Sequence, residues 1–151
     1  MIDILESLRI GLYLESDNLW LKWNSNFEEL VNLSNPEITK WGGPYKELEW
    51  KNKSIFQGLI FNVTTVFELD KDGNPFGGLK HFRFFSATDI NPRSLALLTR
   101  DHFIKLLGTF TIDKSSGDEY YWAWEKNKIR LIVGIEERYS TVFHFHFELV
   151  D

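Results

Sequence analysis

In the last third of the chain, apolar and polar side chains alternate with a period of two. Within VFHFHFEL (142–149), phenylalanine or leucine occupies every second position from 143 onward, and histidine and glutamate lie between them. This is the pattern of a β-strand that buries one face. Residues 119–125 and 129–136 alternate in the same way, and the intervening segments are short enough for hairpins. We therefore expect three consecutive antiparallel strands that share one aromatic face.

The first half of the chain shows a comparable order of elements. The segment FEELVNL (27–33) has a helical pattern, and Asn26 or Ser25 can cap its N-terminus. Glu28 and Glu29 would complement the positive end of the helix dipole. The strands expected in this half span residues 19–23, 45–50, 59–69 and 79–85.

A second helix is predicted at about residues 100–107. Thr99 is the expected N-cap, and Gly108 stands where a glycine commonly ends a helix. Asn91 and Pro92 are expected to open a linker ahead of this helix. The second half thus has the same order as the first, with a short helix followed by a meander of strands.

These patterns together predict an α+β fold. We expect a single domain of residues 1–151 with one curved antiparallel sheet, or two abutting sheets, built from two αβββ-like halves. The halves span about residues 19–85 and 99–151. The short helices are expected to pack on the aromatic face of the strands.

Composition narrows the class of protein. The 151 residues include no cysteine, which excludes disulfides, thiolate metal sites and cysteine nucleophiles and favours a reducing compartment. The N-terminal stretch carries acids where a secretory signal would carry bases, and no apolar run approaches the roughly 20 residues needed to span a bilayer. We therefore expect a cytoplasmic protein without membrane contact.

The acidic excess is confined to one half of the chain. Net charge is −5; residues 1–75 hold 7 Lys and Arg against 12 Asp and Glu, whereas residues 76–151 hold 10 of each class. Nucleic-acid binders usually present a basic stripe, because neutralising phosphates supplies much of their affinity. The sequence therefore argues against nucleic acid and for a partner with a basic surface.

Two groups of residues offer metal chemistry as an alternative. The segment from Asp70 to Asn74 resembles the start of a calcium loop, but the twelfth position, where such a loop needs an acid, is His81. A plain hairpin turn is the preferred interpretation. His144 and His146 point the same way on a strand and could bind one metal ion, with Glu148 or His81 as a third ligand. The preferred interpretation is that both histidines form the polar face of an amphipathic strand.

No sequence motif of catalysis is present. There is no nucleophile elbow, phosphate loop or dinucleotide fingerprint, so we predict a protein that is not an enzyme and that needs no cofactor. The alternative is a small-ligand or metal-dependent enzyme that uses the polar face of the sheet. Most of the aromatic residues alternate in step with apolar strand faces and are expected to form the core.

A partner-binding surface is expected in the acidic half. Trp20 and Trp50 are candidate anchors, because tryptophan often dominates the energy of protein interfaces. Acids near them in the sequence would meet a basic partner. The complete candidate surface consists of Glu15, Asp17, Trp20, Glu28, Glu29, Glu47, Glu49 and Trp50.

Several segments carry a resemblance to a known class of proteins. LWLKWNSNFEEL, GGPYKELEW, IFQGLIFNVTTVFEL, LTRDHFIKLLGTF and YYWAWEKNKIRLIVGIEE, in this order, resemble small bacterial immunity proteins of polymorphic-toxin and contact-dependent growth inhibition systems. The resemblance covers most of the chain and includes no catalytic motif. It implies a cytoplasmic protein that is not an enzyme and that binds and blocks a cognate toxin domain, often a nuclease. It assigns no residue to toxin contact.

Overall fold

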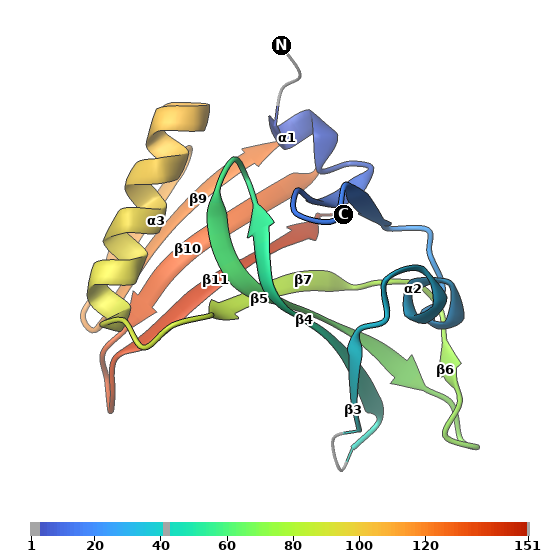
Figure 1. Cartoon of the computed structure of the whole chain (residues 1–151). Helices are drawn as coiled ribbons and strands as arrows, with labels where there is room; N and C mark the ends of the chain where they lie inside the picture. The colour runs from blue at the N-terminus through green and yellow to red at the C-terminus, as the bar shows by residue number, and fades with distance from the viewer. Residues whose placement is uncertain (1–3, 41–42, 151) are drawn as a thin grey trace. The chain divides into compact units, whose positions relative to one another are not determined.

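The computed structural model describes residues 4–40 and 43–150. The chain folds as two compact units, one within Ile10–Ala87 and the other comprising residues 4–9 and 88–150. Each unit has its own antiparallel strands and its own helix (Figure 1). None of the helices that the structure describes is both long and apolar enough to cross a membrane.

The unit within Ile10–Ala87 contains one helix, a two-stranded hairpin and a larger antiparallel sheet. The hairpin pairs β1 (Gly11–Leu14) with β2 (Leu19–Lys22), and the helix is α2 (Phe27–Ser34). The larger sheet has the order β3-β4-β5-β7, and β6 also pairs with β5. Its strands are β3 (Glu37–Lys40), β4 (Tyr45–Ile55), β5 (Leu59–Leu69), β6 (Pro75–Phe76) and β7 (His81–Ser86).

Helix α2 covers the apolar face of this sheet. The Asn26 side chain caps the helix by accepting a hydrogen bond from the backbone N–H of Glu29 at 2.8 Å. Phe27 packs edge-on against Phe67 of β5, with 5.6 Å between ring centroids. Leu30 is fully buried. We call the opposite side of the sheet the outer face.

The second unit has a long helix packed on an aromatic sheet face. Phe103 of α3 contacts Trp124 and Phe145, each with ring centroids 5.6 Å apart. Figure 1 shows α3 lying along these strands. The strands have the order β11-β10-β9-β8, and all neighbours are antiparallel. The elements are α1 (Ile4–Ser7), α3 (Pro92–Leu107), β8 (Ile112–Ser116), β9 (Glu119–Lys126), β10 (Ile129–Glu136) and β11 (Val142–Leu149).

The prediction for the second helix is wrong at its N-terminus. Helix α3 begins at Pro92, and its N-cap is Asn91, whose side chain accepts a hydrogen bond from the backbone N–H of Ser94 at 3.1 Å. Pro92 fits the first helical position because its missing N–H has no partner there in any helix. Thr99 is buried in mid-helix, and its hydroxyl donates to the Leu95 carbonyl at 2.7 Å. The proline that was expected to open a linker therefore starts the helix.

The predicted fold class is confirmed: the protein is α+β, with antiparallel sheets and helices on their aromatic faces. β5 spans the predicted residues 59–69. Strands β1, β3, β6 and β8 were not expected. All four are short, with two to five residues, too few for a clear alternation of apolar and polar positions.

Candidate functional site

The acids of the candidate partner surface lie on two different faces of the first unit. Glu28 and Glu29 are exposed in the first turn of α2, which covers the apolar face of the sheet. Glu47 and Glu49 alternate along β4 with the buried Leu48, so their side chains lie on the outer face. The sheet separates these two pairs, and they cannot form one continuous surface.

Two other predicted acids are engaged inside the unit. The Glu15 carboxylate accepts hydrogen bonds from the Ser54 hydroxyl at 2.8 Å and from the backbone N–H groups of Gln57 and Gly58, both at 3.0 Å. Asp17 forms an ion pair with Lys53 at 2.7 Å. Glu15 holds the turn between β4 and β5, and Asp17 lies against the same hairpin. Both acids thus have a structural role.

The choice of Trp50 as a partner anchor is wrong. Its side chain is 2% exposed, and its indole N–H donates to the Ser34 hydroxyl at 2.7 Å. Trp50 follows Leu48 on the side of β4 that faces α2, so the strand alternation directs it into the core. A residue so deeply buried has no surface to offer a partner.

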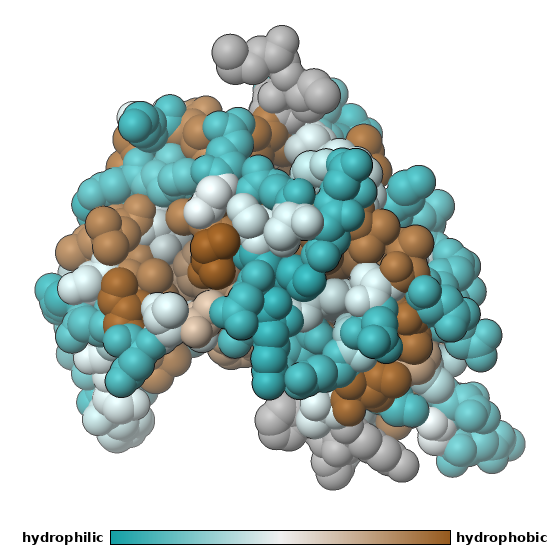
Figure 2. Space-filling view, in the orientation of Figure 1, coloured by the Kyte–Doolittle hydropathy of each residue, from teal (hydrophilic) through white to brown (hydrophobic). Residues whose placement is uncertain are grey.

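The remaining aromatic candidate, Trp20, lines a surface hollow between β2 and α2. This hollow has a volume of about 500 Å³. Leu33 is 53% exposed beside it, and Glu29 is also in its lining. Figure 2 shows hydrophobic atoms at the surface near α2, bordered by hydrophilic ones. The residues that line the β2–α2 hollow are Trp20, Lys22, Ser25, Glu29, Asn32 and Leu33.

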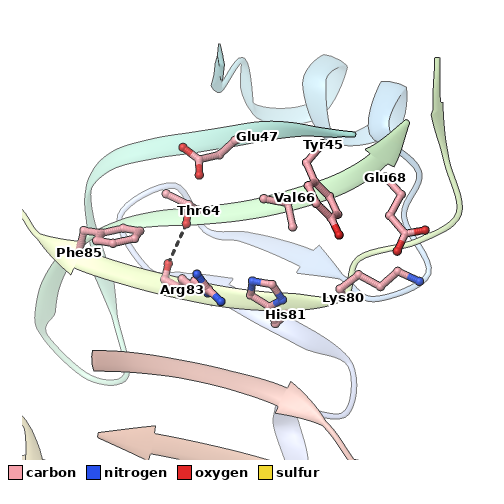
Figure 3. Close-up of a pocket in the computed structure, with 9 residues that line it drawn as sticks. All are labelled: Tyr45, Glu47, Thr64, Val66, Glu68, Lys80, His81, Arg83 and Phe85. Atoms are coloured by element: carbon pink, nitrogen blue, oxygen red, sulfur yellow. Dashed lines mark hydrogen bonds between the residues drawn. The ribbon is translucent and has the colours of Figure 1, made fainter. Parts of the chain in front are cut away.

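A larger hollow, of about 610 Å³, lies on the outer face of β4, β5 and β7. Figure 3 shows its side chains projecting from these three strands and from the residue before β7. Thr64 and Val66 of β5 form its middle, and the Thr64 hydroxyl makes a long hydrogen bond of 3.5 Å to the Arg83 carbonyl. Its complete lining is Tyr45, Glu47, Thr64, Val66, Glu68, Lys80, His81, Arg83 and Phe85.

The charges of this outer-face hollow are arranged by strand. Its acids, Glu47 and Glu68, come from β4 and β5, and its basic side chains come from β7 and the residue before it. Lys80 and Arg83 are exposed, and neither forms an ion pair with any other residue that the structure describes. Sequence reasoning missed this site, although alternation along the predicted strand 79–85 already places Arg83 and Phe85 on one face.

In the second unit, charged side chains on the sheet face opposite α3 form ion pairs with one another. Arg130 of β10 lies between two acids in register, Glu125 of β9 and Glu148 of β11. Its guanidinium is 2.9 Å from the Glu125 carboxylate and 3.8 Å from that of Glu148. Hydrogen bonding to Glu125 raises the pKa of Arg130 above its ordinary value. Further along the same face, the His144 ring lies 3.5 Å from the Glu136 carboxylate.

A smaller hollow of about 140 Å³ lies on this polar face. Gly134 of β10 is paired with Tyr121 on one side and His144 on the other, so the row lacks a central side chain. Burial raises the pKa of Tyr121, and the nearby Arg130 partly offsets this shift. His146 also lines the hollow.

The residues considered for metal binding are placed as follows. Within residues 4–40 and 43–150, no cluster of three or more His, Cys, Asp or Glu side chains could hold a metal ion. The segment that resembles a calcium loop is a turn in which the Asp70 carboxylate accepts hydrogen bonds from the backbone N–H groups of Asp72 and Asn74, both at 2.9 Å. This is the usual role of aspartate in a turn.

Comparison with known proteins supports the fold. No protein-family model matches the chain, and no curated protein matches it significantly. A crystal structure of a DUF4309 family protein, YjgB, from Bacillus subtilis subsp. subtilis str. 168 is similar, with a TM-score of 0.55 and 15% sequence identity. The similarity covers 96% of this chain and 93% of that chain. At this level of identity it is a similarity of fold alone.

Proposed function

We propose that the protein binds a cognate bacterial toxin domain and neutralises it by stoichiometric contact, as an immunity protein of the cytoplasm. The observation that carries this proposal is the composition of the β2–α2 surface. Trp20 and Leu33 offer apolar area there, and Glu28 and Glu29 are exposed acids without an ion pair to any described residue. We define the proposed interface by these four residues.

Each part of this interface has a physical role in binding. A tryptophan that is already partly packed loses little side-chain entropy when a partner covers it, and it brings a large apolar area. The two acids add a negative field that accelerates encounter with a basic surface. A toxin that cuts nucleic acid needs a basic groove for its substrate, and an acidic inhibitor can occupy that groove. A nuclease is therefore the expected class of toxin.

Co-expression tests the function directly. The gene is expressed with the toxin encoded immediately upstream of it, and we expect cell survival and co-purification of the two proteins in a fixed ratio. Absence of both protection and co-purification would refute the proposed function, whatever the behaviour of individual variants.

Charge reversal tests the position of the interface. The double variant E28K/E29K should slow association with the toxin domain about tenfold at low salt, because steering depends on the summed field. E47K/E49K reverses two acids on the outer face, and D118K/E119K reverses two exposed acids of the second unit; both should have smaller effects. Stopped-flow rates at two salt concentrations distinguish the three. If one of the two control pairs slows association most, the interface does not lie at α2.

Removal of the aromatic anchor tests its energetic weight. Trp20→Ala should weaken the complex by about 2 kcal/mol or more, the usual threshold for an interface hot spot. Tyr139→Ala is the control, because Tyr139 is 89% exposed in the second unit. Equal affinities of the two variants, measured by calorimetry, would show that Trp20 does not anchor the partner.

A further inference from the structure

The outer-face hollow is unusual in its exposed aromatic side chains. A sheet face in contact with water normally carries polar residues, yet Tyr45 and Phe85 are 43% and 48% exposed here. Val66, which is half-buried, adds apolar surface between them. Apolar area of this kind on a hollowed face is typical of binding sites.

Strand register gives the hollow its dimensions. Phe85 is paired with Asn62 of β5, and Tyr45 is paired with Glu68 of the same strand. These rows are six residues apart along β5, which corresponds to about 20 Å, and the three strands together are about 10 Å wide. The volume of 610 Å³ lies within the range of small-molecule sites, about 300 to 1,000 Å³.

Charge indicates which end of the hollow takes which chemical group. Arg83 is two residues from Phe85 on the same face of β7, and it has no ion pair with a described residue. An arginine in this position can hold a carboxylate or phosphate through two parallel hydrogen bonds. At the other end, Glu68 beside Tyr45 can accept hydrogen bonds from a donor group, and Lys80 lies next to it (Figure 3), so this end has no excess of positive charge. The extended phosphate backbone of a nucleic acid would meet these acids unfavourably.

We propose that the outer-face hollow binds a small aromatic anion, with Arg83 holding its carboxylate or phosphate and Phe85 in contact with its ring. Thr64, whose own hydrogen bond is long, can turn its hydroxyl to the anion. Lys80 lies at the other end of the hollow, beside Glu68 (Figure 3). Such a ligand uses two features that the sheet face leaves exposed, the aromatic rings and the guanidinium of Arg83. The site is separate from the β2–α2 interface and does not depend on the toxin proposal.

The test uses purified protein and two matched probes, indole-3-acetate and its uncharged analogue indole-3-acetamide. Amide resonances of β5 and β7 in nitrogen–proton correlation spectra should shift saturably with indole-3-acetate. The acetamide should bind roughly tenfold more weakly, because it lacks the charge that Arg83 would pair. Inorganic phosphate and indole-3-acetyl phosphate in parallel titrations separate recognition of the anion alone from recognition of anion and ring together.

Matched variants locate the site. Arg83→Gln and Phe85→Ala should each weaken indole-3-acetate binding about tenfold, a loss comparable to one charge-assisted hydrogen bond or one ring contact. The controls are Arg138→Gln, at another exposed arginine, and Phe76→Ala, whose ring is 49% exposed outside the hollow. The controls should change affinity less than about twofold. The same spectra report whether each variant is folded.

Three results would overturn the proposal. The first is no saturation below about 10 mM indole-3-acetate, weaker than any specific site of this kind should be. The second is equal affinity for the acetate and the acetamide, or equal affinity of phosphate and indole-3-acetate. The third is an Arg83→Gln variant that binds as the wild type does.

Discussion

In each unit, a buried tryptophan donates its indole N–H to the C-terminal end of the helix that packs on the same sheet. Trp50 donates to the hydroxyl of Ser34 at 2.7 Å, and Trp124 donates to the carbonyl of Gly108 at 2.9 Å. In both cases the acceptor precedes the tryptophan by 16 residues. The hydrogen bond allows the largest side chain to be buried without an unsatisfied polar atom. The two units therefore attach helix to sheet in the same way.

The units differ on the opposite faces of their sheets. In the second unit, Arg130 is placed between Glu125 and Glu148, and these charges satisfy one another. In the first unit, Arg83 and Lys80 have no such partners among the described residues, and aromatic rings are exposed beside them. The charges of one face stabilise its own sheet, while the other face leaves two cations, Arg83 and Lys80, without an ion pair to a described residue. This contrast is our reason for placing ligand binding in the first unit.

The largest expected effect comes from breaking the shared tryptophan contact. Trp50→Ala and Trp124→Ala should each reduce the free energy of unfolding by about 3 to 5 kcal/mol, through lost apolar burial and the cavity left behind. Urea denaturation provides the measurement. Trp20→Ala, at a half-buried site, should cost much less. A small loss in only one of the buried variants would show that the two contacts are not equivalent.

A double variant sharpens this comparison. The Ser34 hydroxyl accepts a hydrogen bond from Trp50 and donates one to the Leu30 carbonyl at 3.1 Å. Trp50→Phe removes only the first of these, so Trp50→Phe with Ser34→Ala should be less destabilised than the separate effects predict. The acceptor of Trp124 is a backbone carbonyl, which no side-chain substitution can remove. Additive losses for Trp50→Phe and Ser34→Ala would mean that this hydrogen bond contributes little.

A smaller loss of stability is expected from a substitution on the polar face of the second unit, at Gly134. A Cβ at Gly134 would lie 2.8 Å from the Tyr120 carbonyl oxygen, so Gly134→Ala must push two strands apart. We expect a loss of about 1 to 3 kcal/mol in the free energy of unfolding. Gly43→Ala is the control, since nothing lies within 4 Å of its added Cβ. Thermal unfolding of both variants is the measurement, and equal melting temperatures would contradict the close approach.

Sequence reasoning predicted much of the fold because long strands alternate clearly. The period of two is plain in β5 and in β9–β11, and Asn26 was foreseen as a possible cap of α2. The start of α3 could not be read in this way, because an Asn-Pro pair suits both a turn and the first turn of a helix.

The candidate surface was harder to predict than the fold, because it depends on which face a side chain occupies. The prediction that Trp50 anchors a partner requires an exposed side chain, although Leu48, two residues earlier on β4, is on the same side of the strand and is buried. The contacts of Glu15 with Ser54 and Gln57 leave no signal in the sequence, because these residues are about 40 positions away from Glu15. Acidic composition indicates the kind of partner, but only the sheet decides which acids can meet it.

The charge networks of the two faces should respond differently to loss of an arginine. Arg130→Gln removes the charge between two acids and should cost up to about 1 kcal/mol of unfolding free energy at low salt. Arg83→Gln should leave stability within about 0.5 kcal/mol of the wild type. Urea denaturation at low and high salt measures both, and the cost at Arg130 should shrink as salt screens the pairs. Equal losses of unfolding free energy in Arg130→Gln and Arg83→Gln would contradict the proposed difference between the two sheet faces.

The smallest effect concerns pH and tests the polar face of the second unit through Tyr121. Burial raises the pKa of this phenol, so at pH values above about 10 the unfolded chain loses the proton before the folded one does. The folded state then binds more protons, and stability must fall as pH rises toward the folded pKa. Tyr121→Phe should remove this part of the alkaline decline.

Arg130 lowers the pKa of Tyr121 through its charge, so Arg130→Gln should raise that pKa further and Arg83→Gln should leave it unchanged. The measurement is the ultraviolet absorbance of tyrosinate as a function of pH. Each protein is titrated with and without the additional substitution Tyr121→Phe, and the difference between the two curves is the titration of Tyr121. If that titration moves to lower pH in Arg130→Gln, the guanidinium does not act on Tyr121 as its position implies. If Arg83→Gln moves it equally, the shift does not report on the polar face of the second unit.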